Sequence, residues 1–92
     1  MDVTVKFHLS ARLTGTEEDE LTIVLQEGVS IDELYRLLGR RYPVFAENFL
    51  SARERKNRKI PLLAVVNRKS ISLNQKIKHG DYVDIFLIAA GG

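Results

Sequence analysis

The sequence predicts an α+β fold in which one mixed β-sheet packs on one main helix. A stretch near the start of the chain alternates apolar with polar residues, and one near the end places Val83, Ile85 and Leu87 on one face, patterns typical of strands. One central stretch has apolar residues at helical spacing behind a capping signal. The elements follow in the order strand, strand, helix, strand, short strand, strand. A chain of 92 residues has room for a single domain with one modest core.

The first two strands are predicted from these patterns. Odd positions of residues 3–9 are apolar and even positions are polar or charged. Residues 21–25 place leucine or isoleucine at each odd position, on one face of a second strand. The intervening residues 10–20 contain a glycine and a run of four acidic residues, which indicates a solvated connection. We expect the two strands to pair as an antiparallel hairpin around this long loop.

The main helix is predicted to begin after Ser30. Glu33 follows Ser30 by three residues, the spacing of a capping box. Apolar residues then recur on one side, and arginines near the end suit the negative end of the helix dipole. Pro43 is expected to end the helix, because proline lacks a backbone N–H group. Residues 44–52, with two phenylalanines four positions apart, could form a short second helical turn.

The second half of the chain predicts the remaining strands. Leu62–Val66 is a continuous apolar run of strand type. A turn at residues 67–69 and a short strand with Ile71 follow. Leu73 and Ile77 are expected to close the core over an irregular stretch.

The last strand is predicted over residues 82–89, after a Gly-Asp turn. Phe86 and Ile88 fall on the opposite face from its valine and isoleucine. If no helix covers them, they form an exposed apolar patch for a partner protein. The alternative is that they pack beneath the phenylalanines that follow the main helix. Arg68 and Lys69 at the neighbouring turn could add charge steering.

Several classes of chemistry are excluded by what the sequence lacks. There is no cysteine, so the chain has no disulfide, no thiolate metal site and no thiol nucleophile. His8 and His79 stand in no recognisable motif and predict ordinary surface histidines. No metalloprotease, phosphate-loop or dinucleotide-binding motif is present. We therefore expect no catalysis by this chain alone, and no bound metal.

The apolar runs are too short for a membrane protein. The longest stretches without charge, residues 60–67 and 85–92, have eight residues, whereas a spanning helix needs about 20. The first ten residues have no continuous apolar segment of the kind that a secretory signal requires. We expect a cytoplasmic protein without membrane attachment.

Residues 53–59 (RERKNRK) form the main basic segment. They hold five of the 14 basic residues, and the rest of the chain carries more acidic than basic side chains. No aromatic residue interrupts the segment, whereas single-strand binders use aromatic side chains to stack bases. We interpret it as a solvated loop and do not expect nucleic-acid binding. The alternative is a docking patch for an acidic partner, or a weak phosphate contact.

The tail of the sequence, Ala89, Ala90, Gly91 and Gly92, is uncharged and nearly free of side chains. A frayed end is the simplest interpretation. However, glycines without a Cβ atom let the backbone pass through a narrow channel. The terminal carboxylate could then enter the active site of another protein, where it would be activated. We therefore predict that this tail is functional.

The residues that carry chemistry resemble the MoaD/ThiS family of ubiquitin-like sulfur carriers. The resemblance covers nearly the whole chain. It is most specific in the block LLAVVNRKSISLNQKIKHGDYVDIFLIAAGG (residues 62–92) and in the helix with its Tyr-Pro, SIDELYRLLGRRYP (residues 30–43). It implies a β-grasp domain over residues 1–92, with residues 89–92 as a flexible tail.

The resemblance also implies the partners. An E1-like adenylyltransferase would use ATP and Mg²⁺, which this chain would not bind itself, to adenylate the Gly92 carboxylate. A sulfurtransferase would then convert the adenylate to a thiocarboxylate. Ala89, Ala90 and Gly91 would contact the partner along with the last strand.

The chain length favours the molybdopterin branch, with the large subunit of molybdopterin synthase as sulfur acceptor and this chain as its small, non-catalytic subunit. The Pro-Pro step that often precedes the tail in that branch is absent, because Leu87, Ile88 and Ala89 follow Phe86. A carrier for thiamine or another sulfur-containing product therefore stays open. So do a protein modifier conjugated through Gly92 and a plain interaction domain that acts through its basic loop.

Overall fold

The computed structural model describes residues 1–50, 61–71 and 74–88. Leu73, expected in the core, and the basic segment 53–59 lie outside the described residues. The elements, in chain order, are β1 (Asp2–His8), α1 (Ala11–Thr14), β2 (Glu20–Val24), α2 (Ile31–Arg41), α3 (Pro43–Phe49), β3 (Leu62–Val66), β4 (Lys69–Ile71) and β5 (Tyr82–Leu87).

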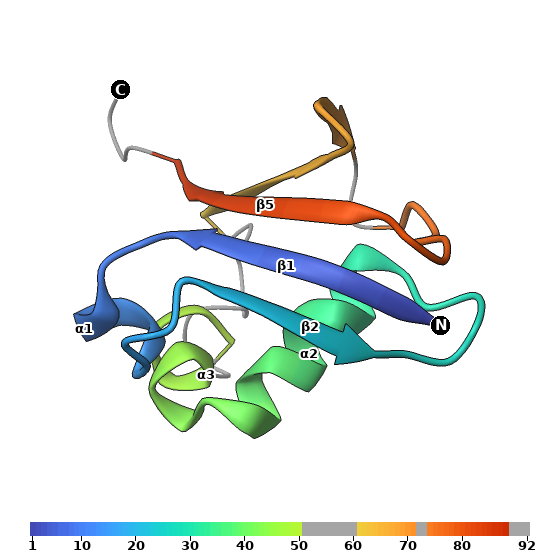
Figure 1. Ribbon diagram of the computed structural model, residues 1–92. Helices are drawn as coiled ribbons and strands as arrows, with labels where there is room; N and C mark the ends of the chain where they lie inside the picture. The colour runs from blue at the N-terminus through green and yellow to red at the C-terminus, as the bar shows by residue number, and fades with distance from the viewer. Residues whose placement is uncertain (51–60, 72–73, 89–92) are drawn as a thin grey trace.

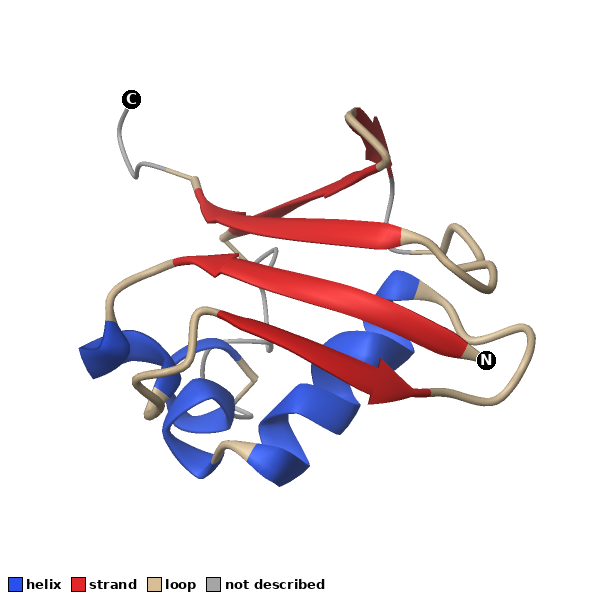
Figure 2. Ribbon diagram, in the orientation of Figure 1, coloured by secondary structure: helices blue, strands red, loops and turns tan. Residues whose placement is uncertain are grey.

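The strands form one mixed sheet in the order β2-β1-β5-β3-β4 (Figure 1). The central pair, β1 and β5, is parallel, and the other neighbouring pairs are antiparallel. The three helices lie on one side of the sheet, and α2 runs across the β1–β2 half (Figure 2). This arrangement is the expected β-grasp fold, and the antiparallel pairing of the first two strands is confirmed.

The predicted capping box fixes the start of α2. The Glu33 N–H group donates to Ser30 Oγ (3.2 Å), and the Ser30 N–H group donates to Glu33 Oε1 (3.2 Å). The Ser30 hydroxyl also donates to Glu33 Oε1 (3.1 Å), and this bond and the one from the Ser30 N–H group favour the charged carboxylate, so they lower the pKa of Glu33. The helix ends at Arg41, and Pro43 then occupies the first turn of α3. Proline fits there because that position needs no N–H donor.

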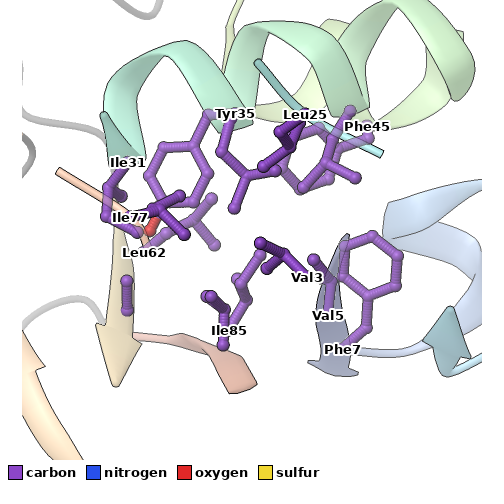
Figure 3. Packing of buried hydrophobic residues seen from close by; sticks show 14 of the residues in the cluster. Val3, Val5, Phe7, Leu25, Ile31, Tyr35, Phe45, Leu62, Ile77 and Ile85 are labelled. Carbon is purple, nitrogen blue, oxygen red and sulfur yellow. The ribbon is translucent and has the colours of Figure 1, made fainter. Parts of the chain in front are cut away.

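The core fills the space between α2, α3 and the sheet (Figure 3). Each strand contributes the alternate residues that face the helices, and Ile77 closes the core as predicted. Tyr35 is fully buried, and its hydroxyl has no hydrogen-bond partner among the described residues. Burial raises the pKa of Tyr35, because the charged phenolate is disfavoured away from water. The buried core residues of the strands are Val3, Val5, Phe7, Leu21, Leu62, Ala64, Val66, Val83 and Ile85.

Residues 11–14 differ from the prediction, which treated residues 10–20 as a solvated connection. They form the short helix α1, and Gly15 ends it with a φ of 83°. Thr14 is buried, and its hydroxyl donates to the Thr16 carbonyl (3.2 Å) and accepts from the Thr16 N–H group (3.3 Å). A single helical turn has no repeating apolar pattern, so periodicity could not reveal it. The second helical turn expected within residues 44–52 is confirmed as α3.

Candidate functional site

β5 leads from the centre of the sheet to the tail. It lies between β1 and β3, and its pairing with β3 continues past the strand, because the Ile88 N–H group donates to the Pro61 carbonyl (2.9 Å). Ile88 is the last described residue. The predicted thiocarboxylate site Gly92 and the predicted partner-binding residues Ala89, Ala90 and Gly91 lie outside the described residues, and their roles stay predictions.

An apolar patch lies on the sheet face opposite the helices, next to the start of the tail. We call Leu63, Phe86 and Ile88 the β5 patch. Leu63 and Phe86 are register partners on adjacent strands. Leu63 is 37% exposed, Ile88 is 50% exposed and Phe86 is half-buried. Two exposed aliphatic side chains around an aromatic ring offer a surface for a protein partner.

The β5 patch is not covered by the helices. Phe45 and Phe49, the residues that could have covered it, are buried in the core on the other side of the sheet. They pack against one another with ring centroids 5.2 Å apart. Of the two interpretations of Phe86 and Ile88, the structure therefore supports the exposed one.

The imidazole ring of His8, on the neighbouring strand β1, stacks on the ring of Phe86. The two rings are stacked, with centroids 4.1 Å apart and an angle of 9° between their planes. His8 Nε2 lies 2.7 Å from Asp84 Oδ1. A carboxylate only accepts hydrogen bonds, so Nε2 carries the proton and donates. The pair places a polar border along one side of the β5 patch.

The other half of the same face is polar. The Tyr82 hydroxyl crosses β1 and donates to Glu20 Oε1 of β2 (2.6 Å). This bond is the main reason that the pKa of Tyr82 rises to about 12, because it would be lost on ionisation. Lys6 and Asp84 are register partners between the two halves. The face therefore changes from polar at the start of β5 to apolar at its end.

Arg68 and Lys69 lie at the turn from β3 into β4, which is beside the start of β5 and away from the β5 patch. The Asn67 N–H group donates to the Tyr82 carbonyl (2.9 Å), and Asn67 Nδ2 donates to Asp81 Oδ1 (2.8 Å). Val66 pairs with Val83, three residues before Phe86, which is roughly 10 Å along a strand. The structure does not bring these cations together with Phe86 and Ile88, so a steering role for them stays a prediction.

Two residues of this surface were missed from the sequence. His8 was interpreted as an ordinary surface histidine, although it stacks on Phe86. Leu63 was assigned to a continuous apolar strand without a face, and the structure shows that it faces outward. The outward direction of Leu63 could have been predicted. In a sheet that packs on helices on one side only, every second residue of each strand faces away from the core. No local signal identifies His8, since its partners lie far along the chain.

In the described residues, the side chains that could ligate a metal lie apart from one another or in pairs. Within them, no group of three or more histidine, aspartate or glutamate side chains gathers as metal ligands. In the same part of the chain, every helix is too short or too polar to cross a bilayer. The exposed apolar side chains on the sheet face beside the end of β5 are suited to docking of a protein partner.

Comparisons with known proteins agree with this geometry. The model of the ThiS family matches residues 7–92. A search of curated proteins gave no match. Among solved structures, the chain is similar to SAMP1 from Haloferax volcanii, with a TM-score of 0.77, 13% identity and 100% of both chains covered.

Two further structures share the fold. A putative molybdopterin converting factor subunit 1 from Pyrococcus furiosus has a TM-score of 0.71 and 25% identity, covering 96% of this chain and 98% of that one. The complex of subunits 1 and 2 of the molybdopterin-converting factor from Helicobacter pylori gives a TM-score of 0.58 and 20% identity over 100% of both chains. With the family model extending through the last glycine, the chain belongs to the ThiS family of ubiquitin-like sulfur carriers.

Proposed function

We propose that this chain carries sulfur as a thiocarboxylate on Gly92 and delivers it to a sulfur-accepting enzyme. The observation that carries the proposal is the match to the ThiS family, which extends from residue 7 through the Gly-Gly end of the sequence. The chain acts as a co-substrate with no catalysis of its own. We also propose that the protein works in the cytoplasm, a reducing compartment in which a chain needs no disulfide.

The proposed chemistry has two steps, both catalysed by partner proteins. A Gly92 carboxylate oxygen attacks the α-phosphorus of ATP in an E1-like enzyme, and pyrophosphate leaves. A hydrosulfide equivalent from a sulfurtransferase then attacks the acyl carbon, and AMP leaves with the original oxygen. The Mg²⁺ and ATP belong to the activating partner, where the metal stabilises charge on the phosphates. Two glycines without side chains leave the acyl carbon open to attack.

The β5 patch is the proposed docking surface for these partners. It lies on the strand that leads into the tail, so a protein bound there has the tail beside it. Its exposed leucine and isoleucine surround an aromatic ring, and buried aromatic residues dominate the energy of many interfaces. Ala89, Ala90 and Gly91 complete the contact as the chain enters the active site of the partner.

The sulfur acceptor we favour is the large subunit of molybdopterin synthase. Support comes from the 25% identity to the putative molybdopterin converting factor subunit of P. furiosus, which covers nearly all of both chains. The missing Pro-Pro step before the tail leaves a thiamine-type or other sulfur acceptor as the alternative.

A second candidate is a protein modifier joined through Gly92 to lysine side chains. The observation that favours it is the TM-score of 0.77 to SAMP1, the small archaeal modifier protein 1. Carrier and modifier share the adenylate and differ only in the nucleophile that attacks it.

An alkylation experiment tests the carrier proposal. The protein is incubated with a lysate of its host, ATP, Mg²⁺ and sulfide, and is then treated with iodoacetamide under denaturing conditions. The chain has no cysteine, so a rapidly alkylated sulfur on it is a thiocarboxylate. We expect one adduct that requires ATP and is absent from a variant lacking Gly92. Failure to form the adduct in a lysate that thiocarboxylates a known carrier would overturn the proposal.

The same reactions separate the acceptors. Addition of purified molybdopterin synthase large subunit and its pterin precursor should consume the thiocarboxylate if the favoured acceptor is correct. If the thiocarboxylate persists while a thiamine-pathway acceptor consumes it, the sulfur goes to that branch. Covalent species of higher mass that contain an isopeptide bond at Gly92 would support the modifier.

A further inference from the structure

A groove lies between the outer edge of the sheet and the main helix, away from the β5 patch. It has a volume of about 430 Å³. Its apolar floor and wall come from the end of β2, the following loop and α2. Its polar lining consists of two arginines and a glutamate of α2 and a glutamine of the loop. The residues that matter here are Val24, Leu25, Val29, Arg36, Leu37 and Arg40.

The backbone of β2 is open along this groove. The Leu25 N–H group donates to the Met1 carbonyl (2.8 Å), and the Met1 amino group donates to the Leu25 carbonyl (2.7 Å). In an antiparallel pair, residues bonded in this way alternate with residues whose N–H and C=O groups point away from the partner strand. Those groups of Thr22 and Val24 therefore point to the outer edge. β2 ends the strand order of the described sheet, so no described strand pairs with them.

This edge lacks the usual protection against strand addition. Natural edge strands are blunted by lysine, proline, a bulge or a covering segment. The strand ELTIV has neither lysine nor proline, and it pairs with β1 in unbroken register. Val24 is 76% exposed, the largest exposure among the large apolar residues of the described chain. An open, regular edge beside an apolar groove has the geometry that accepts another strand.

The polar lining of the groove has a net positive charge. Arg40 is exposed and forms no ion pair with any described residue. Arg36 forms an ion pair with Asp32, one helical turn away, at 3.0 Å. Both side chains are accessible to solvent, so the pair is weak and a ligand carboxylate can replace Asp32. Glu33 also lines the groove and is held by Ser30 in the capping box, so the lining carries two arginines and one carboxylate, a net positive charge. The charge of the lining is therefore complementary to an acidic ligand.

We propose that an extended peptide segment of a partner protein adds to β2 as a further strand. Its backbone pairs with Thr22 and Val24, and its alternate apolar side chains rest on Leu25, Val29 and Leu37. An acidic residue at one end of the segment contacts Arg36 and Arg40. The site lies at the edge of the sheet, with β1 between it and β5, so it does not depend on Gly92 or on the β5 patch.

Titration of the ¹⁵N-labelled protein with synthetic peptides tests this site. The probe is an acetylated heptapeptide, Asp-Glu-Ile-Thr-Val-Thr-Ile, used together with the version that places Asp-Glu at the other end, because strand direction is not fixed by the groove. We expect shift changes on β2 and on the Arg36–Arg40 face of α2, and slower hydrogen exchange at the Thr22 and Val24 amides. Replacing Asp-Glu by Lys-Lys in the peptide should abolish the effect.

Variants separate backbone pairing from charge. Val24→Pro removes one outward N–H donor without touching the bonds to β1, and proline is tolerated at such edge positions. We expect it to weaken binding about fivefold, whereas Val24→Thr, which keeps the donor, should bind nearly as the unchanged protein does. The pair Arg36→Glu and Arg40→Glu should weaken binding about tenfold or more. Phe86→Ala should have no effect, and the spectrum of β1 and β5 verifies folding of each variant.

Three results would overturn the proposal. The first is absence of shift changes with both peptides at millimolar concentration. The second is binding that Val24→Pro and the arginine variants leave unchanged, or that maps to the β5 patch. The third is concentration-dependent dimerisation through β2 in sedimentation experiments without peptide, which would make a second copy of the chain the occupant.

Discussion

Phe86 is held in place by a contact between distant parts of the chain. Its ring lies against the imidazole of His8, which Asp84 fixes through a hydrogen bond of 2.7 Å. The aromatic surface is thus oriented before any partner arrives. Ordering a side chain in advance reduces the entropy that binding must overcome. Phe86 therefore has the properties of a residue that contributes strongly to docking.

The first prediction concerns this residue. Phe86→Ala should lower kcat/KM for ATP-dependent adenylation of the chain by about tenfold or more, as expected for a central aromatic residue of an interface. The measurement is pyrophosphate exchange with the activating enzyme at varied carrier concentration. The double variant Arg68→Ala and Lys69→Ala, beside the other end of β5, serves as the matched control and should change the rate much less. Equal effects of both changes would contradict the assignment of the β5 patch.

Ionisation of Tyr82 makes the free energy of unfolding depend on pH in the alkaline range. Its hydrogen bond to Glu20 raises its pKa from 10.0 in the unfolded chain to about 12 in the folded chain. The folded state thus keeps the proton more tightly, so the stabilisation is complete below pH 10 and is lost as the pH rises to about 12. Tyr82→Phe should therefore show a shallower fall of the free energy of unfolding across this window.

Urea unfolding at a series of pH values measures this difference. The unchanged protein and Tyr82→Phe both retain Tyr35, whose pKa burial also raises, so its contribution cancels between them. Glu20→Gln removes the acceptor charge but keeps a neutral acceptor, so it should flatten the curve less than Tyr82→Phe does. Parallel curves for all three proteins would show that the Tyr82–Glu20 bond does not form in solution.

At the scale of elements, the two serines before helices provide a matched test of capping. Ser30 accepts a hydrogen bond from the Glu33 N–H group, whereas Ser10 at the start of α1 makes no capping bond with its side chain. Ser30→Ala should lower the free energy of unfolding by about 1 kcal/mol, and Ser10→Ala should have little effect. Urea denaturation at neutral pH compares them. Equal losses would contradict the capping geometry.

Two glycines with the same backbone conformation test the packing of α1 on α3. Gly15 and Gly28 have φ angles of 83° and 84°. A Cβ atom at Gly15 would lie 2.8 Å from Val44 Cβ, whereas one at Gly28 would meet nothing within 4 Å. Both alanine variants incur the left-handed penalty of about 1 kcal/mol, and only Gly15→Ala adds a clash. Thermal unfolding should show a clearly lower Tm for Gly15→Ala, and equal values would contradict the contact.

Most elements could be predicted from the sequence because their signals are local. Alternation identified β1, apolar residues at every second position identified β2 and β5, and the pair Ser30 and Glu33 marked the start of α2. Helix α1 escaped prediction because four residues are too few to show a period, although Gly15 directly after it is a typical helix stop. The burial of Thr14 could not be predicted either, because a hydrophobic pattern identifies only apolar residues as buried.

At the scale of the whole molecule, the sheet brings together residues that the sequence separates. The parallel pairing of β1 with β5 aligns His8 with Phe86, and the antiparallel pairing of β3 with β5 aligns Leu63 with Phe86. Local patterns contain no information on which strands become neighbours, so the sequence predicted Phe86 and Ile88 but not the residues around them. The same topology puts β2 at an edge and thereby creates the second proposed surface.

The fold separates three tasks in space. The tail after β5 is proposed to carry the sulfur, and the β5 patch beside it to bind the activating and accepting enzymes. The groove along β2 is proposed to bind a peptide strand at the edge of the sheet. Because the two surfaces do not overlap, a partner at β2 could hold the carrier while its tail reacts.

The central claim is that sulfur is placed on Gly92, and intact-mass spectrometry with fragmentation of the chain tests it most directly. Fragmentation is needed because oxidation of Met1, the single methionine, adds one oxygen and changes the nominal mass as much as replacing oxygen by sulfur does. After incubation with host lysate, ATP and sulfide, the account predicts that the added mass stays with fragments containing Gly92. An unchanged mass in an active lysate, or added mass confined to fragments containing Met1, would contradict it.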